Sequence, residues 1–284
     1  MRAVWLLGVS VLLGGAHLAV EQAQDGARAL ASADLPTAAE GAALADRILS
    51  RHRKAPQGQG PALVDYAALA RDPGALQQVR AWYAQTSPDT LTGAPDRLAY
   101  WVNGYNISMI AAVLDAWGGN PGWSVSESEF AIFNRRIHDF GGLRLTLNEI
   151  EHVVLRGDGG RFTGPDGDRE RALQAHGAVW AGSKPDARIH MVLNCASWGC
   201  PNLPARALTA SNLEATLAAA SRRYVSNQLR GAGPKGVSQL FSWYGSDFGG
   251  PEGVKSFVGS YREGQGEVAF DAEIPYDWRL NIAQ

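Results

Sequence analysis

The two cysteines of the chain lie in one segment that also carries a histidine, an asparagine and a serine. Cys195 and Cys200 follow a short apolar run, and His190 lies inside that run. A thiol becomes a nucleophile when a nearby histidine, cation or helix N-terminus lowers its pKa. The segment 188–202 therefore predicts thiol chemistry, with Cys200 or Cys195 as the nucleophile and His190 as the base.

The spacing of these residues favours one of the two cysteines. The apolar run 189–193 indicates a buried strand that empties into a loop, where ligands and catalytic side chains tend to gather. Side chains alternate along a strand, so His190 shares a face with Asn194 whereas Cys195 points to the opposite face. A loop that turns back would bring Cys200 over His190 more easily. The site is expected at the carboxyl end of this strand.

Other interpretations of the same residues stay open. In an oxidising compartment Cys195 and Cys200 could form a structural disulfide, worth about 2 kcal/mol for so short a ring. A labile redox pair is a further possibility, although the spacing is not C-x-x-C. Glu149 and His152 form one i, i+3 pair on a helix face, and carboxylate-bridged metal sites need two such pairs, so neither a metal nor a cofactor is expected. Ser197 does not lie in a G-x-S-x-G elbow, which disfavours a serine hydrolase.

One long helix is expected to position the site. The segment 98–117 has apolar residues at i, i+3 and i+4 spacing, and Asn103 and Asn106 continue this buried stripe. A buried carboxamide must be hydrogen-bonded, or each unmet group costs about 1–3 kcal/mol. We therefore expect both asparagines in a network or in the site. Gly104 in the helix interior predicts the close approach of another backbone.

The N-terminus and the composition indicate an exported protein. Arg2 followed by an apolar stretch resembles a secretory signal, which predicts a signal peptide over 1–19, a flexible segment over 20–41 and one globular domain over 42–284. The expected location is periplasmic or secreted. With 284 residues, 45% of them hydrophobic, and a net charge of -2, the chain can bury a full core and gives no electrostatic case for nucleic acid. No membrane span is expected after the leader.

Five ordered segments, which cover roughly residues 60–281, carry a family resemblance. They are Tyr100–Asn106, Leu145–His152 with Arg156, Ile189–Pro201, Leu240–Phe248 and Tyr276–Asn281. Together these segments resemble the domain-of-unknown-function 547 family. Ile107 and Gly199 depart mildly from the family pattern, which usually has alanine and serine at these positions.

The order of a central helix, a histidine-bearing strand and a late aspartate is similar to the papain and transglutaminase group of thiol hydrolases. The resemblance implies an α+β fold in which the central helix packs on a mixed or antiparallel sheet. In that group the nucleophilic cysteine opens the central helix, whereas here the helix offers Asn103 and Asn106. No catalytic residue is therefore carried over from it.

These observations lead to two alternative functions. The first is an exported thiol-dependent hydrolase of peptide or amide bonds in a small-molecule or peptide ligand. Its asparagines would orient His190 or stabilise an oxyanion, and Trp198 would wall the pocket. The second is a non-catalytic domain that binds a ligand or partner and contains a structural Cys195–Cys200 disulfide. The residues expected to bind the substrate are Asn103, Asn106, Asn194, Ser197, Trp198 and Asp277.

Overall fold

The computed structural model describes residues 36–264 and 266–283. The predicted signal peptide, 1–19, and most of the segment 20–41 lie outside the described residues. From Thr37 onward the chain forms one compact unit. Its first helix, α2, begins at Ala38, where Thr37 and Glu40 form a capping box. The ordered domain therefore begins a few residues before the predicted boundary at 42.

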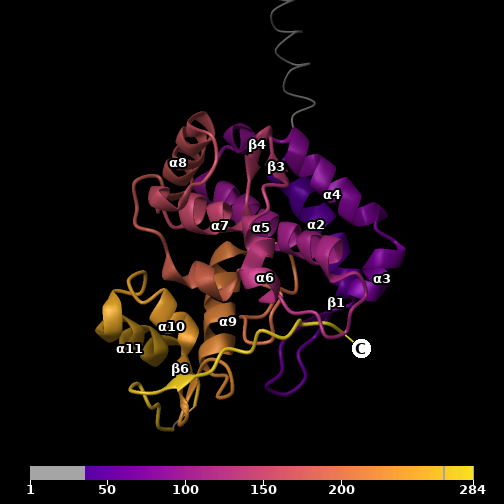
Figure 1. Cartoon of the computed structure of the whole chain (residues 1–284). Helices are drawn as coiled ribbons and strands as arrows, with labels where there is room; N and C mark the ends of the chain where they lie inside the picture. Colours follow the sequence, from indigo (N-terminus) through magenta and orange to yellow (C-terminus); the bar gives the residue numbers. More distant parts are fainter. Residues whose placement is uncertain (1–35, 265, 284) are drawn as a thin grey trace, which may run out of the picture. The chain divides into compact units, whose positions relative to one another are not determined.

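Helices make up most of the ordered chain. The α-helices are α2 (Ala38–His52), α3 (Tyr66–Arg71), α4 (Gly74–Gln85), α5 (Ala94–Trp117), α6 (Glu127–Phe130), α7 (Leu147–Glu149), α8 (Asp166–Trp180), α9 (Leu213–Val225), α10 (Gln239–Trp243) and α11 (Gly250–Tyr261) (Figure 1). Short 3-10 helices are η1 (Pro88–Thr90), η2 (Ala131–Asn134), η4 (Gly159–Arg161) and η5 (Ala187–Met191), and η3 (Ile150–Leu155) is a π-helical segment. The Thr146–Glu149 capping box opens α7.

The strands form three small sheets within the described residues. They are β1 (Arg53–Lys54) paired with β2 (Leu63–Val64), β3 (His138–Phe140) paired with β4 (Leu143–Leu145), and β5 (Ala232–Gly233) paired with β6 (Gly236–Ser238), which also pairs with β7 (Glu273–Ile274). All pairs are antiparallel except β6 with β7, which is parallel. The predicted α+β class is confirmed, with helices in the larger share.

The predicted strand over Ile189–Asn194 is wrong. Residues 187–191 form the 3-10 helix η5, and the Asp186 carboxylate caps it by accepting the Arg188 backbone N–H at 2.9 Å. Met191 is buried in a cluster with Tyr224 and other apolar residues rather than on the face of a sheet. A short apolar run can be buried in either way, so its composition did not distinguish a strand from a buried helical turn.

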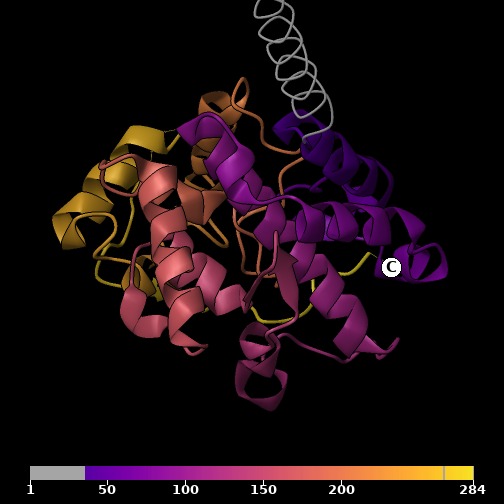
Figure 2. The same ribbon diagram turned by 90° about the horizontal axis from the view of Figure 1, so that it is seen from above.

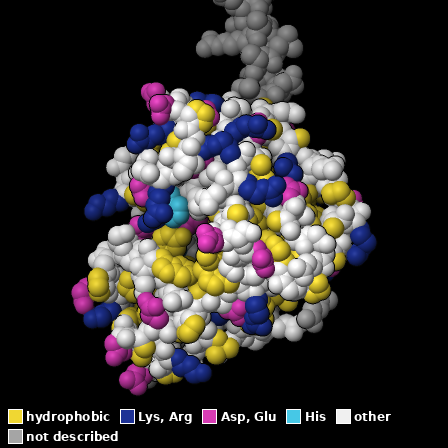
Figure 3. Space-filling view, in the orientation of Figure 1, with side chains coloured by type: hydrophobic (Ala, Val, Ile, Leu, Met, Phe, Trp, Pro, Cys, Tyr) yellow, Lys and Arg dark blue, Asp and Glu magenta, His cyan; other side chains and the backbone are white. Residues whose placement is uncertain are grey.

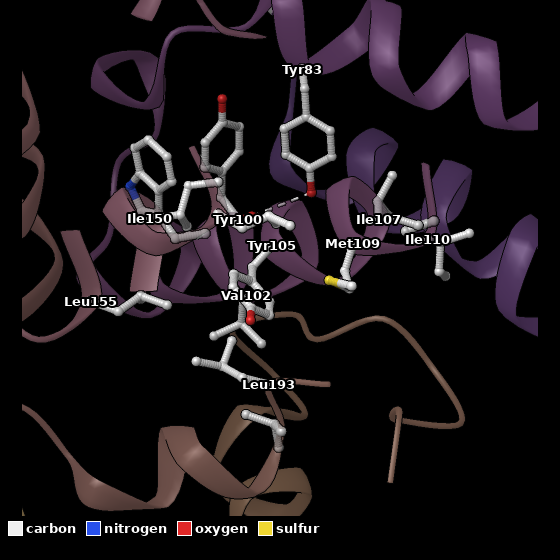
Figure 4. Close-up of a cluster of buried hydrophobic side chains, with 14 of the residues drawn as sticks. Tyr83, Tyr100, Val102, Tyr105, Ile107, Met109, Ile110, Ile150, Leu155 and Leu193 are labelled. Atoms are coloured by element: carbon white, nitrogen blue, oxygen red, sulfur yellow. Dashed lines mark hydrogen bonds between the residues drawn. The ribbon is translucent and has the colours of Figure 1, made fainter. Parts of the chain in front are cut away.

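Helix α5 is the centre of the core. It packs against α2, α4 and α8, and the two views agree that it lies between α8 on one side and α2 and α4 on the other (Figures 1 and 2). Figure 4 shows its apolar side chains, with Tyr83 of α4 donating a hydrogen bond to the Tyr100 carbonyl at 3.3 Å. Leu193, just before the cysteines, belongs to the same cluster. The cysteine segment is thus attached to the most buried helix.

Aromatic rings, rather than the predicted backbone, lie close to Gly104 of α5. A Cβ at this position would lie 2.6 Å from Cε1 of Phe140 and 3.2 Å from Cε1 of Tyr83. We expect Gly104→Ala to lower the free energy of unfolding by about 1–3 kcal/mol, because it overpacks the core. The control is Gly177→Ala in α8, where a Cβ would meet nothing within 4 Å; it should raise that free energy by up to about 1 kcal/mol. Urea unfolding measures the free energy of unfolding of both variants. Changes of the same sign would contradict the close packing at Gly104.

Candidate active site

A cavity of about 580 Å³ brings together residues from distant parts of the chain. Tyr105 comes from α5, Glu151 from η3 and His190 from η5, while Cys195 and Tyr276 come from the loop and the C-terminal segment. In Figure 3 hydrophobic side chains gather in a hollow where Figure 1 places α6, α10 and the C-terminal segment. The cavity therefore contains the predicted thiol and the predicted histidine.

Asparagine side chains fix the loop that carries the cysteines. Asn106 of α5 donates to the Val192 carbonyl and accepts the Asn194 backbone N–H, both at 2.9 Å. Asn194 in turn donates to the Pro201 carbonyl at 2.7 Å and accepts the Ala196 N–H at 3.1 Å. Both asparagines are buried. They hold the two ends of the loop, with backbone groups as their partners.

The C-terminal segment runs beside the same loop. Backbone hydrogen bonds of 2.8–2.9 Å join Trp198 N–H to the Arg279 carbonyl, Gly199 N–H to the Asp277 carbonyl, and Asn281 N–H to the Ala196 carbonyl. Figure 1 shows this segment crossing the molecule toward β1. The pairing places Tyr276, the residue at the start of the segment, against the sulfur of Cys195.

The Cys195 sulfur is surrounded by hydrogen-bonding groups. It lies 2.8 Å from the Cys200 sulfur, 2.9 Å from the Ser197 hydroxyl and 3.2 Å from the Tyr276 hydroxyl. Burial alone would raise the pKa of Cys195, but hydrogen bonds from Cys200, Ser197 and Tyr276 outweigh it and lower the pKa to about 7. Burial and the neighbouring Cys195 raise the pKa of Cys200 well above its ordinary value. Cys195 is therefore the thiol that ionises first.

The structure makes Cys195, rather than the predicted Cys200, the more accessible thiol. Both cysteines line the cavity, but Cys195 is half-buried, whereas Cys200 is buried and its sulfur accepts the Cys195 backbone N–H at 2.9 Å. The preference for Cys200 rested on strand alternation, which is absent because His190 lies in a 3-10 helix. In the described chain no hydrogen bond joins His190 to either cysteine. Both thiols are free in this structure, so the disulfide stays a prediction.

His190 is hydrogen-bonded to a carboxylate, that of Asp247, which was not among the predicted site residues. Its Nε2 lies 2.8 Å from Oδ2 of Asp247, and Arg156 donates two hydrogen bonds to the same carboxylate at 2.5 and 3.0 Å. Burial would raise the pKa of Asp247, but the hydrogen bonds from His190 and Arg156 hold it well below the ordinary range. The His190 ring stacks on Tyr244 at 4.1 Å between centroids. Because Nε2 faces Asp247, Nδ1 is the ring nitrogen left to exchange a proton with a ligand.

Glu151 is the buried carboxylate that lines the cavity. Tyr244 donates to its Oε1 at 2.5 Å and Tyr105 to its Oε2 at 3.0 Å. Burial first, and then the charge of Glu151, raise the pKa of both tyrosines. Their hydroxyls therefore stay protonated and serve as donors to the carboxylate.

The other predicted ligand-binding residues have different surroundings. Asn103 bonds both backbone groups of Leu208, at 2.8 and 2.9 Å. The Asp277 side chain forms an ion pair with Arg279, whose guanidinium lies over the Trp198 ring at 5.0 Å. Of the predicted set, Ser197 contacts Cys195 directly. Asn103 and Asn106 bond to backbone groups, and Asn194 bonds to backbone groups and to the Asn281 side chain. Trp278, next to Asp277, is the residue of the closing pair that lines the cavity.

The Glu149–His152 pair has protein partners. Glu149 is fully buried and accepts hydrogen bonds from Arg136, Thr146 and Thr163, and His152 contacts Arg156 at 2.7 Å. Across residues 36–264 and 266–283, no group of three or more His, Cys, Asp or Glu residues is placed to hold a metal ion. Over that same part of the chain, no helix has the length and apolar character needed to cross a bilayer.

Several residues of the site were not predicted from the sequence. They are Glu151, Tyr276, Tyr244 and Trp243, which line the cavity, and Asp247, which contacts His190. All five lie inside segments that carry the family resemblance, so their motifs were visible but their pairings were not. His190 meets Asp247 across 57 residues and Cys195 meets Tyr276 across 81, and spacing along one sequence cannot reveal such contacts.

Removing the Asn106 side chain should loosen the cysteine loop. We expect Asn106→Ala to lower the free energy of unfolding by about 2–3 kcal/mol, because the Val192 carbonyl and the Asn194 N–H would both be left buried without a partner. Asn134→Ala, which removes one exposed hydrogen bond to Asn148, is the matched control and should change it by less than about 0.5 kcal/mol. Chemical denaturation measures the free energy of unfolding of both variants. Equal small losses would contradict the role of Asn106 in holding the cysteine loop.

Comparison with known protein families found a match. Residues 88–225 match the family model described as "Protein of unknown function, DUF547". This match supports the family that the five segments predicted. Neither a search of curated proteins nor a search of solved structures found a significant match. The similarity to the papain and transglutaminase group stays a prediction.

Proposed function

We propose that the protein is a thiol-dependent hydrolase of amide or peptide bonds, with Cys195 as its nucleophile. The observation that carries the proposal is the position of Cys195, which opens into a 580 Å³ cavity with its pKa lowered toward 7. At neutral pH a substantial fraction of this thiol is thiolate, which is the form that attacks carbonyl carbons.

The proposed reaction has two steps. The Cys195 sulfur attacks the carbonyl carbon, a C–S bond forms and the C–N bond breaks, and the thiol proton leaves with the amine. Water then attacks the thioester, which releases the carboxylic acid and returns a proton to the sulfur. His190, which lines the same cavity, is the group proposed to carry the proton, and Asp247 holds its ring in place.

An exported location is part of the proposal. It rests on the signal-like residues 1–19. In an oxidising compartment both thiols would have to stay reduced for Cys195 to act as a nucleophile. Their sulfurs lie 2.8 Å apart, close enough to form a disulfide after a small movement. This distance also favours the second candidate, a non-catalytic binding domain in which Cys195 and Cys200 are bridged.

Acylation with p-nitrophenyl acetate tests the proposal. The expected result is a rapid acetylation confined to the peptide that contains Cys195, much faster than in urea-denatured protein, followed by slow deacetylation. Quenched samples are read by peptide mass spectrometry, with Cys195→Ser as the control. Acetylation of Cys195 at the denatured-protein rate would contradict the hydrolase, and a bridge between the cysteines in protein taken from the export compartment would favour the binding domain.

A further inference from the structure

The wall of the cavity is unusually rich in aromatic rings. Seven aromatic side chains line it: Tyr105, Phe130, Phe133, Trp243, Tyr244, Tyr276 and Trp278. Trp243 is 47% exposed, although large aromatic side chains are normally covered. It stacks on Trp278 with 5.5 Å between ring centroids and packs on Tyr276 at 4.9 Å. These three rings form a rigid wall at the opening.

The charge of the same cavity is negative. Glu151 is the carboxylate among its lining residues, and within the described chain no lysine or arginine lines it. Glu151 is 8% exposed, and its hydrogen bonds come from the neutral hydroxyls of Tyr105 and Tyr244. The guanidinium of Arg156, near Tyr244, is already paired with Asp247. No ion pair therefore neutralises Glu151 within the described residues.

We propose that this cavity recognises an organic cation, an alkylammonium or guanidinium group carried by the substrate, between its aromatic wall and Glu151. A cation is attracted to the faces of tryptophan and tyrosine rings within about 6 Å of their centroids. A buried carboxylate that lacks a counter-ion adds a Coulomb attraction that solvent screens only weakly. The inference deepens the proposed hydrolase, on which it rests, by naming the substrate class as cationic amides or peptides.

Choline and its neutral isostere 3,3-dimethylbutan-1-ol provide a direct binding test. Isothermal titration calorimetry of each probe with the full chain should show choline binding at least about tenfold more tightly than the alcohol. Glu151→Gln should weaken choline binding by about tenfold and leave the alcohol unchanged. Trp243→Leu, at an exposed position that does not threaten folding, should weaken choline severalfold. Phe270→Leu, also exposed but outside the cavity, should have no effect.

The outcomes separate this inference from the proposed function. Equal affinity for choline and the alcohol, or an unchanged affinity in both Glu151→Gln and Trp243→Leu, would overturn the cation site even if Cys195 still acylates. Conversely, choline binding with the expected preference, in a wild-type protein whose Cys195 is not acylated by p-nitrophenyl acetate, would support the cation site and reject the hydrolase. Thermal melts of each variant confirm that the titrated protein is folded.

Discussion

Cys195→Ser should reduce hydrolysis of an activated ester by roughly 10³-fold or more, whereas Cys200→Ala should lower it only severalfold at pH 7. The two thiols differ because Cys195 is half-buried and Cys200 is buried, although both line the cavity. Loss of the Cys200 hydrogen bond should raise the pKa of Cys195 by about one unit, since hydrogen bonds to charged groups contribute about 1.5–3 kcal/mol. The rate of Cys200→Ala should then fall severalfold at pH 7 and recover at higher pH.

Rate profiles from pH 5 to 10 for the wild type and both variants provide the measurement. Urea unfolding of the same proteins is the control. If the cysteines served only as a disulfide, Cys195→Ser and Cys200→Ala would lower the free energy of unfolding equally, by about 2 kcal/mol, and neither would alter a rate. Equal activity losses in the two variants would also contradict the assigned roles.

Asp247→Asn should be the most destabilising of the polar substitutions in the site. Arg156 and Asp247 are only 14% and 19% exposed, so loss of the carboxylate charge leaves a largely buried guanidinium without its counter-ion. We expect the free energy of unfolding to fall by about 3 kcal/mol at pH 7. Asp158→Asn, at an exposed carboxylate that pairs with Arg161, is the matched control and should cost less than about 1 kcal/mol.

The effect of Asp247→Asn should depend on pH in one direction. The folded-state pKa of Asp247 lies below that of an unfolded aspartate, about 3.9. Its ionised form therefore stabilises the fold fully above about pH 4, and this contribution is lost as the pH falls further through the folded-state pKa. Denaturation at pH 7 and pH 3 should show the difference between wild type and variant shrinking at pH 3. A difference that stays constant or grows would contradict the ion pair.

Local sequence signals predicted local structure well. The helix expected over 98–117 exists as α5. It begins earlier, at Ala94, and contains Pro95 in its first turn, a usual helix-start signal. The spacing of Thr146 and Glu149 is typical of a capping box, and the structure contains both of its hydrogen bonds. Such features need only three or four neighbouring residues, so the sequence contains all the information that determines them.

The errors arose where burial depends on distant partners. The run at Ile189 is apolar because it packs on α9, not because it lies in a sheet. Asp186 was a readable helix start just before it. The backbone there is helical, so its side chains do not alternate as they do in a strand. The predicted pairing of Cys200 with His190 depended on that alternation. Gly104 shows the same limit: its closeness to a neighbour was predictable, but the identity of Phe140 was not.

The asparagines illustrate how a correct pattern can lead to an unexpected role. Asn103 and Asn106 were predicted to be buried and hydrogen-bonded, and they are. Their partners, however, are backbone groups 86 and more residues away. A carboxamide on a buried stripe indicates that a partner exists. Only the folded chain shows that the partner is Leu208 for Asn103 and the cysteine loop for Asn106.

The rate at which iodoacetamide alkylates Cys195 as a function of pH tests the central claim most directly. Peptide mass spectrometry would follow Cys195 and Cys200 separately in the folded full-length protein. The hydrolase account predicts that Cys195 reacts with a midpoint near pH 7, well below the ordinary value of about 8.5, while Cys200 stays unreacted. A Cys195 that reacts only above pH 8.5, or no faster than Cys200, would contradict its role as the nucleophile.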